Sequence, residues 1–205
     1  MVIKVKIIRD FESEFYTKKN RLLGNCFTII DNDNKYYYEF CINNTTAIIK
    51  ADNLECITDA VSEFRKYNSY INIFKTLDNS YYEEFDPVFT FKLPVNVIQP
   101  SKFFIDKDKV DIIENYMESD NIYISVAIIN DEYVLLDGHH RLYTMIQNYD
   151  KLVNVYISNY DYYINDFIYI AKEQNIFNVK SMPVLSHDEY DKYWNGFLSD
   201  YFKNI

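Results

Sequence analysis

Histidine, glycine and tryptophan are scarce in this chain of 205 residues, which has three histidines, three glycines and one tryptophan. Cysteine also occurs only three times, and Cys26, Cys41 and Cys56 show no CxxC spacing. An odd number of widely separated cysteines argues against a disulfide framework or a structural zinc site. We therefore expect all three to be reduced, buried thiols.

Positive charge is in deficit as well. The chain has 21 Lys and Arg against 31 Asp and Glu, which gives a formal net charge of −10. Such a surface repels phosphate backbones, so generic DNA binding is disfavoured. The opening stretch "MVIKVKIIRDFESEF" carries charges throughout and alternates like a strand, so it predicts neither a signal peptide nor a membrane span. We expect a cytoplasmic protein without membrane contact.

Hydrophobic residues, in contrast, are plentiful at 48% of the chain, with 21 tyrosines and 15 phenylalanines. The length suggests one domain with an addition, or two small domains. Residues 1–92 predict a β-rich accessory region, with strands at 2–8, 25–42 and 45–52 and a turn within 31–34. A helix capped by Asp52 or Asn53 should bury one face of four residues, namely Leu54, Ile57, Val61 and Phe64. Residues 68–93 show no clear hydrophobic period and predict an extended connection into the second unit.

Residues 93–160 predict a better-defined unit. Short strands are expected at 95–98, 122–129, 132–136 and 152–157. The first helix should start near Asp106 or Asp108, and helical periods in this unit place six residues inward: Val110, Ile113, Met117, Leu142, Met145 and Ile146, followed by Tyr149. The resulting order is β-α-β-β-α-β, so the fold class is α+β.

Residues 161–205 predict two helices that pack on this core. The first runs from about 162 to 173. The second follows Pro183, where Ser186 and Glu189 match a capping box. Its aromatic residues recur every three or four positions and predict a buried stripe: Tyr190, Tyr193, Trp194, Phe197, Leu198, Tyr201 and Phe202. His187 is expected to be a surface residue next to the cap.

The stretch "LLDGHHRLY" (135–143) concentrates the rare residues at one place. It lies between a predicted strand and a predicted helix, so the unpaired N–H groups of the first helical turn can bind an anion. Gly138 allows a sharp turn and close approach of a ligand. His139, His140 and Arg141 add donors, and arginine can bind a phosphate with two hydrogen bonds.

Asp137 precedes these donors and would repel a bare phosphate. It could instead hold Mg²⁺ that bridges to the phosphate, or take a proton from a hydroxyl nucleophile. A metal site built from His139 and His140 is disfavoured, because adjacent side chains diverge and no third ligand is evident. Lys102, just after Pro100, is a candidate for a second phosphate contact. The bland alternative is a surface turn with polar residues.

Residues 93–160, from "LPVNVIQPSKFFIDKDKV" through "VLLDGHHRLYTM", resemble the ParB/sulfiredoxin superfamily. Sulfiredoxins have a cysteine nucleophile where this chain has His139, so the resemblance does not imply thiol chemistry. The partition proteins bind CTP and continue into a helix-turn-helix domain that we do not find here. The free serine kinases carry a DGHHR loop that holds nucleotide phosphates. Their glutamate just after the first strand has no counterpart before Asp106, which argues against serine as the acceptor.

The resemblance implies an ATP- or ADP-type nucleotide, or CTP, bound with Mg²⁺. Asp137 and His140 would then be catalytic residues of phosphoryl transfer to a small molecule, and Asp137 would also be the metal ligand. Gly138, His139, Arg141 and Lys102 would complete the phosphate site together with His140. The alternatives are a non-catalytic, nucleotide-responsive regulatory module, and a ParB-like DNA-binding or nuclease protein. A second copy of the chain is a further candidate partner.

Overall fold

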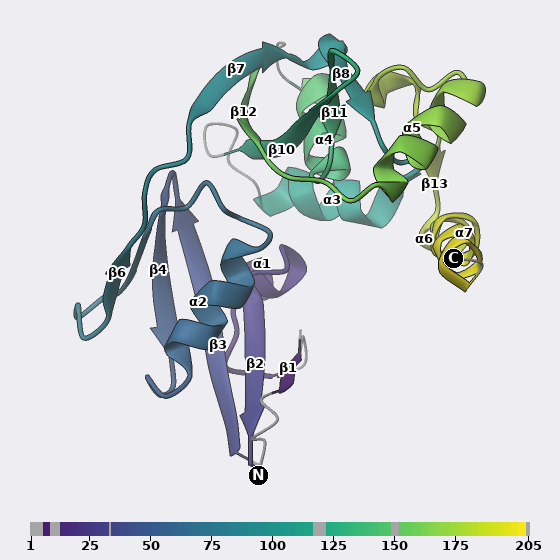
Figure 1. Ribbon diagram of the computed structural model, residues 1–205. Helices are drawn as coiled ribbons and strands as arrows, with labels where there is room; N and C mark the ends of the chain where they lie inside the picture. Colours follow the sequence, from purple (N-terminus) through teal and green to yellow (C-terminus); the bar gives the residue numbers. More distant parts are fainter. Residues whose placement is uncertain (1–5, 9–12, 33, 117–121, 149–151, 204–205) are drawn as a thin grey trace. The chain divides into compact units, whose positions relative to one another are not determined.

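The computed structural model describes residues 6–8, 13–32, 34–116, 122–148 and 152–203. The chain divides into two compact units, Met1–Val88 and Phe89–Ile205 (Figure 1). The sequence placed this boundary between residues 92 and 93. Residues 2–5 of the first predicted strand lie outside the described residues, as do Asp33, Met117 and Tyr149 of the other predicted patterns.

The first unit is a six-stranded sheet with the strand order β1-β2-β3-β4-β5-β6. All neighbours are antiparallel except β4 and β5. Its elements are β1 (Lys6–Ile8), α1 (Lys18–Leu22), β2 (Cys26–Asp31), β3 (Asn34–Asn43), β4 (Thr46–Ala51), α2 (Ile57–Arg65), β5 (Ile73–Thr76) and β6 (Tyr82–Glu84). The β-rich prediction is confirmed for this part of the chain. The predicted extended connection is wrong, because residues 68–93 include β5, β6 and the start of the next sheet.

Helix α2 of this unit starts later than the sequence predicted. Cys56 adopts a left-handed conformation with φ of 61°, which separates α2 from the preceding residues. Leu54 therefore lies before the helix and is 41% exposed, whereas Ile57, Val61 and Phe64 are buried. The prediction of three buried thiols is also only partly correct. All three cysteines are free, but Cys41 is exposed.

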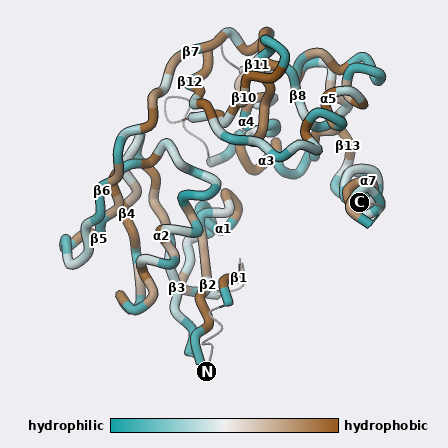
Figure 2. The backbone as a smooth tube through the Cα atoms, in the orientation of Figure 1, coloured by the Kyte–Doolittle hydropathy of each residue, from teal (hydrophilic) through white to brown (hydrophobic). Residues whose placement is uncertain are grey.

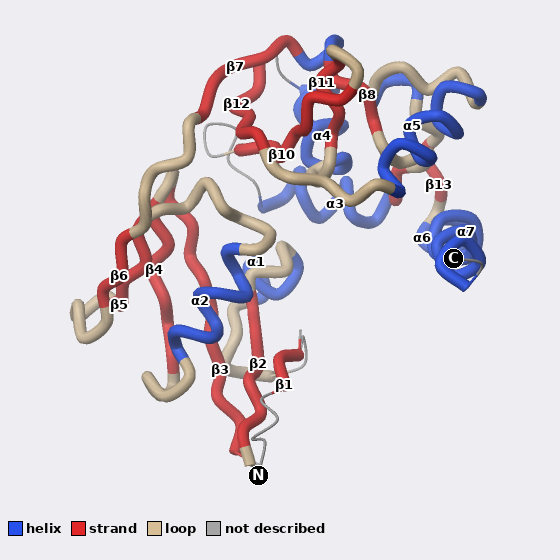
Figure 3. The backbone as a smooth tube through the Cα atoms, viewed as in Figure 1, coloured by secondary structure: helices blue, strands red, loops and turns tan. Residues whose placement is uncertain are grey.

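The second unit contains a five-stranded sheet with the order β7-β12-β10-β11-β8 and a two-stranded parallel pair, β13-β9 (Figure 3). Its strands are β7 (Thr90–Pro94), β8 (Ile98–Pro100), β9 (Ile105–Asp106), β10 (Tyr123–Ile129), β11 (Glu132–Leu135), β12 (Leu152–Ile157) and β13 (Val184–Leu185). Its helices are α3 (Lys107–Tyr116), α4 (His139–Asn148), α5 (Tyr163–Glu173), α6 (His187–Tyr190) and α7 (Gly196–Lys203), with short turns η1 (Val95–Val97) and η3 (Val179–Ser181). The α+β class is confirmed. The strand expected at 95–98 is displaced, since 95–97 form a 3₁₀ turn.

The core of this unit follows the alternation of side chains along β10. Ile124 and Val126 belong to the main hydrophobic cluster, together with residues of α3 and α4. Ala127 and Ile129 lie in a second cluster with residues of α5. The two faces of β10 thus belong to different clusters, as its two-residue period requires, and α5 contributes residues to both. In Figure 2, β10 and β11 are among the segments coloured brown for hydrophobic residues.

The C-terminal helical segment departs from the predicted stripe. Ser186 and Glu189 form the predicted capping box. Residues 191–195 then form a π-helical turn, η4 (Asp191–Asn195), which shifts the phase of the following residues. Trp194 is buried, but Tyr193 is 50% exposed. No helix in the described ranges is long and apolar enough to cross a bilayer.

Candidate anion site at the start of helix α4

Two parallel strands bring the site together. In the register of β8 and β11, Leu135 pairs with Pro100, so both strands leave the sheet at the same place. The residues after β8, Ser101 and Lys102, therefore lie beside the turn that leads from β11 into α4. The Ser101 hydroxyl donates to the Leu135 carbonyl at 2.6 Å and ties the two segments together.

Gly138 forms this turn in a conformation that other residues avoid. Its φ is +90°, and its carbonyl accepts the first helical hydrogen bond, from Leu142 N–H at 2.8 Å. A Cβ atom at this position would lie 2.7 Å from Ile124 Cδ1 and 3.2 Å from Arg141 Nε. Glycine is thus required both by backbone angle and by space, and the N–H groups of α4 begin directly after it.

His139 is almost completely buried, at 1% exposed. Its Nε2 accepts a hydrogen bond from the Ser101 backbone N–H at 3.1 Å. A backbone N–H can only donate, so Nε2 carries no proton and the neutral ring bears its proton on Nδ1. Burial lowers the pKa of His139 well below its usual value, in agreement with a neutral ring. His139 Nδ1 forms no hydrogen bond with any described residue.

His140 is held in the same way by a different segment. Its Nε2 accepts from the Asp106 backbone N–H at 3.0 Å, which again places the proton on Nδ1. Burial lowers the pKa of His140 to about 3, and the ammonium groups of Lys102 and Lys109 act in the same direction. Both histidines are therefore neutral, and their Nε2 atoms contact two different segments, at Ser101 and at Asp106. No cluster of three or more metal-ligating side chains occurs within the described ranges.

Asp137 and Arg141 form an ion pair across one turn, with Nη2 and Oδ2 2.8 Å apart. Arg141 Nη1 also donates to the Tyr123 carbonyl at 3.3 Å, so its guanidinium is held over Gly138 rather than extended into solvent. Desolvation acts to raise the pKa of Asp137, but Arg141 and Lys102 outweigh it and keep this pKa below its usual range. Asp137 is thus a charged carboxylate with its side chain 58% exposed.

Lys102 is partly buried and faces the same turn. Its ammonium lies 5.5 Å from the centre of the Trp194 ring. Burial lowers the pKa of Lys102, and the Asp137 carboxylate only partly offsets this effect. Among the described residues, no carboxylate lies within 4.0 Å of this ammonium. A partly desolvated cation without a close counter-ion is a candidate binding group for an anionic ligand.

The third histidine reaches the same site from the C-terminal segment. His187 Nδ1 lies 2.9 Å from Oδ2 of Asp106, whose side chain is completely buried. Asp106 Oδ1 accepts from Asp108 N–H at 3.0 Å and so caps α3. The Tyr190 ring, one turn further along α6, lies 5.6 Å from the His140 ring. Sequence reasoning missed His187 and Asp106; the one available signal was that the chain has only three histidines.

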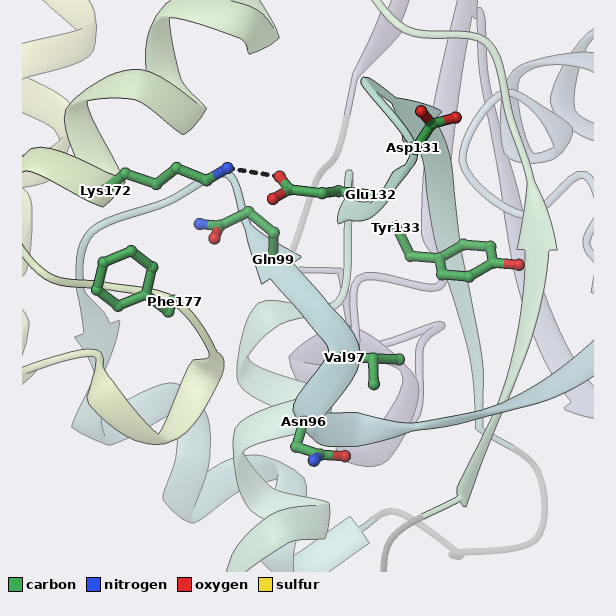
Figure 4. Close-up of a pocket in the computed structure, with 8 residues that line it drawn as sticks. All are labelled: Asn96, Val97, Gln99, Asp131, Glu132, Tyr133, Lys172 and Phe177. Atoms are coloured by element: carbon green, nitrogen blue, oxygen red, sulfur yellow. Dashed lines mark hydrogen bonds and ion pairs between the residues drawn. The ribbon is translucent and has the colours of Figure 1, made fainter.

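A cavity of about 520 Å³ lies at the opposite ends of β8 and β11 (Figure 4). It is lined by Asn96, Val97, Gln99, Asp131, Glu132, Tyr133, Lys172 and Phe177. Lys172 and Glu132 form an ion pair across it, with a distance of 2.5 Å. Because this cavity is at the start of the two strands and the α4 turn is at their end, it is separate from the anion site.

Neither a protein-family model nor a curated protein matches the chain. A solved structure, protein Atu1540 from Agrobacterium tumefaciens, is similar with a TM-score of 0.35 and 12% sequence identity. The match covers 47% of this chain and 62% of that protein.

Proposed function

We propose that the start of α4 binds the phosphates of a nucleotide of the ATP or ADP type. The observation that carries this proposal is the partly buried, unpaired ammonium of Lys102 beside the first turn of α4. The N–H groups of that turn and the positive end of its dipole favour an anion. His140 is neutral and only partly buried, so its Nδ1–H can add a hydrogen bond, whereas buried His139 supports the turn from inside. Both leave the positive charge to Lys102.

Asp137 fits the role of a Mg²⁺ ligand in this proposal. It is charged and exposed at the mouth of the turn. Mg²⁺ in nucleotide sites is held by one or two carboxylates together with the phosphates, so a single aspartate suffices. When bound, the metal would neutralise part of the phosphate charge during transfer to a small-molecule acceptor. Arg141 would act chiefly by positioning Asp137 and the Gly138 turn.

The test is a thermal-shift panel of nucleotides with and without Mg²⁺ on Lys102→Gln and a matched control. Lys180→Gln removes an exposed lysine from the same unit and leaves the site intact. A ligand at 100 times its dissociation constant stabilises the folded state by about 2.7 kcal/mol. We expect the wild type and the control to show a stabilisation of this order, and Lys102→Gln to lose most of it.

Three outcomes refine or reject the proposal. Binding without any turnover of ATP would favour the nucleotide-responsive regulatory module over the enzyme. Equal stabilisation of wild type and Lys102→Gln would place the nucleotide elsewhere, and the absence of any shift across the panel would reject nucleotide binding.

A further inference from the structure

Phosphoryl transfer to a hydroxyl needs a group that accepts the hydroxyl proton, and the side chains at the site differ in their ability to do so. His139 and His140 have their Nε2 lone pairs directed at the backbone N–H groups of Ser101 and Asp106. Their Nδ1 atoms already carry protons. Neither ring can therefore accept a further proton without breaking a hydrogen bond that holds it in place.

The two carboxylates are also poor acceptors. Asp137 is paired with Arg141 at 2.8 Å, and a carboxylate stabilised in its charged form is a weak base. Asp106 is completely buried, and its oxygens accept from Asp108 N–H and face His187. It is not accessible to a substrate.

His187 has the one imidazole lone pair at the site that remains open. A carboxylate only accepts, so the 2.9 Å contact with Asp106 places the His187 proton on Nδ1. Its Nε2 then keeps its lone pair, and it forms no hydrogen bond with any described residue. The side chain is 58% exposed. A buried aspartate that orients a partly exposed histidine is the arrangement by which hydrolases build a general base.

His187 is also connected to the phosphate-binding turn. Asp106, its partner, donates its own N–H to His140. Tyr190, one helical turn after His187, contacts the His140 ring, and Lys109 lies 5.0 Å from the Tyr190 ring. The same side of α6 therefore meets both Asp106 and His140. The charged groups that face His187 from the neighbouring elements are Asp106 of β9 and Asp108 and Lys109 of α3.

We propose that His187, oriented by Asp106, is the general base that activates a hydroxyl acceptor at this site. This inference rests on the proposed nucleotide function. The acceptor O–H bond breaks and its proton passes to Nε2 of His187. The acceptor oxygen bonds to the terminal phosphorus, whose bond to the bridging oxygen breaks, and the nucleoside diphosphate leaves with that electron pair. His187 returns the proton to solvent, so the products are a phosphorylated acceptor, the diphosphate and one proton.

The experiment measures ATP hydrolysis with Mg²⁺, in which water is the acceptor, between about pH 5.5 and 9, together with ADP affinity by calorimetry. The variants are His187→Gln and, as a control on the same helix, Asp188→Asn, which changes an exposed charge. We expect the wild-type rate to fall at low pH as His187 becomes protonated. His187→Gln should lower the rate about 10²–10⁴-fold and abolish this acid limb, with ADP affinity unchanged. Asp188→Asn should retain both.

An independent measurement does not depend on turnover. In an NMR titration of the wild type, one imidazole should titrate above its ordinary pKa because of Asp106, and the other two should stay neutral. The His187→Gln spectrum identifies the titrating signal. Three results would each overturn the assignment of His187 as the base and leave nucleotide binding intact. They are titration of His187 at its ordinary pKa, an unchanged pH profile in His187→Gln, and a wild type that binds ADP but does not hydrolyse ATP. A wild type that binds no nucleotide rejects the proposed function itself.

Discussion

Replacement of Gly138 by alanine should lower the free energy of unfolding more than any other addition of a single methyl group at the site. The left-handed backbone at φ of +90° costs an alanine about 1–2 kcal/mol. The new Cβ would lie 2.7 Å from Cδ1 of Ile124, a residue of β10 in the middle of the five-stranded sheet. Overpacking of this kind lowers stability by about 1–3 kcal/mol. We expect Gly138→Ala to lower the free energy of unfolding by about 2–5 kcal/mol in total.

The other two glycines of the chain provide matched controls. Gly24 also has a positive φ, of +75°, but a Cβ there would meet no atom within 4 Å. Gly24→Ala should therefore cost only the backbone term of about 1–2 kcal/mol. Gly196 lies at the start of α7 with open space around it and ordinary helical angles. Gly196→Ala should stabilise the protein by about 0.5–1 kcal/mol.

Urea unfolding can separate these effects by unit. The chain has one tryptophan, and Trp194 is buried in the second unit, so its fluorescence reports on the unit that contains Gly138 and Gly196. Far-ultraviolet circular dichroism follows the whole chain and captures Gly24→Ala. If Gly138→Ala lowers the free energy of unfolding no more than Gly24→Ala does, the contact with Ile124 is relieved without loss of stability, and this prediction is wrong. Thermal shifts with ATP should also be lost in Gly138→Ala, since the first turn of α4 is displaced.

Three further predictions concern charge, thiols and pH. Asp137→Asn should keep or raise nucleotide affinity measured without metal and abolish its dependence on Mg²⁺; an undiminished Mg²⁺ effect would exclude Asp137 as the ligand. In the folded protein a thiol reagent should modify exposed Cys41 readily, whereas Cys26, whose pKa burial raises to about 12, should react only on unfolding. The free energy of unfolding should fall as the pH drops from about 6.5 toward 3. In this range His139 and His140 bind protons in the unfolded chain but stay neutral in the folded protein. A flat profile from urea titrations across this range would contradict their neutral, buried state.

The parts of the site that depend on neighbouring residues were predictable from the sequence. The alternation before residue 136, the rare Gly138 and the helical period after it predict a strand, a turn and a helix, and the structure has all three. Asp106 near the start of α3 and the Ser186–Glu189 capping box are equally local. Each of these signals needs only the chain within a few residues.

Long-range parts of the site could not be predicted in the same way. The proximity of Lys102 to the α4 turn depends on the parallel pairing of β8 with β11, which a single sequence does not specify. The contact between His187 and Asp106 spans 81 positions, and His187 looks like any polar residue after a helix cap. The exposure of Tyr193 depends on a π-helical turn whose single extra residue has no clear sequence signature.

The parallel pairing of β9 with β13 also sets the order in which the parts of the site can form during synthesis of the chain. Ile105 N–H donates to the Pro183 carbonyl at 2.9 Å, and Leu185 is in register with Asp106. The turn at Gly138 forms from neighbouring residues, but the partner of Asp106 is synthesised some eighty positions later on the ribosome. A nascent chain therefore has the proposed phosphate-binding turn before it has His187 in place. Completion of the site waits for the segment around residue 187, so proteolysis between α5 and β13 would separate ligand capture from any chemistry that needs His187.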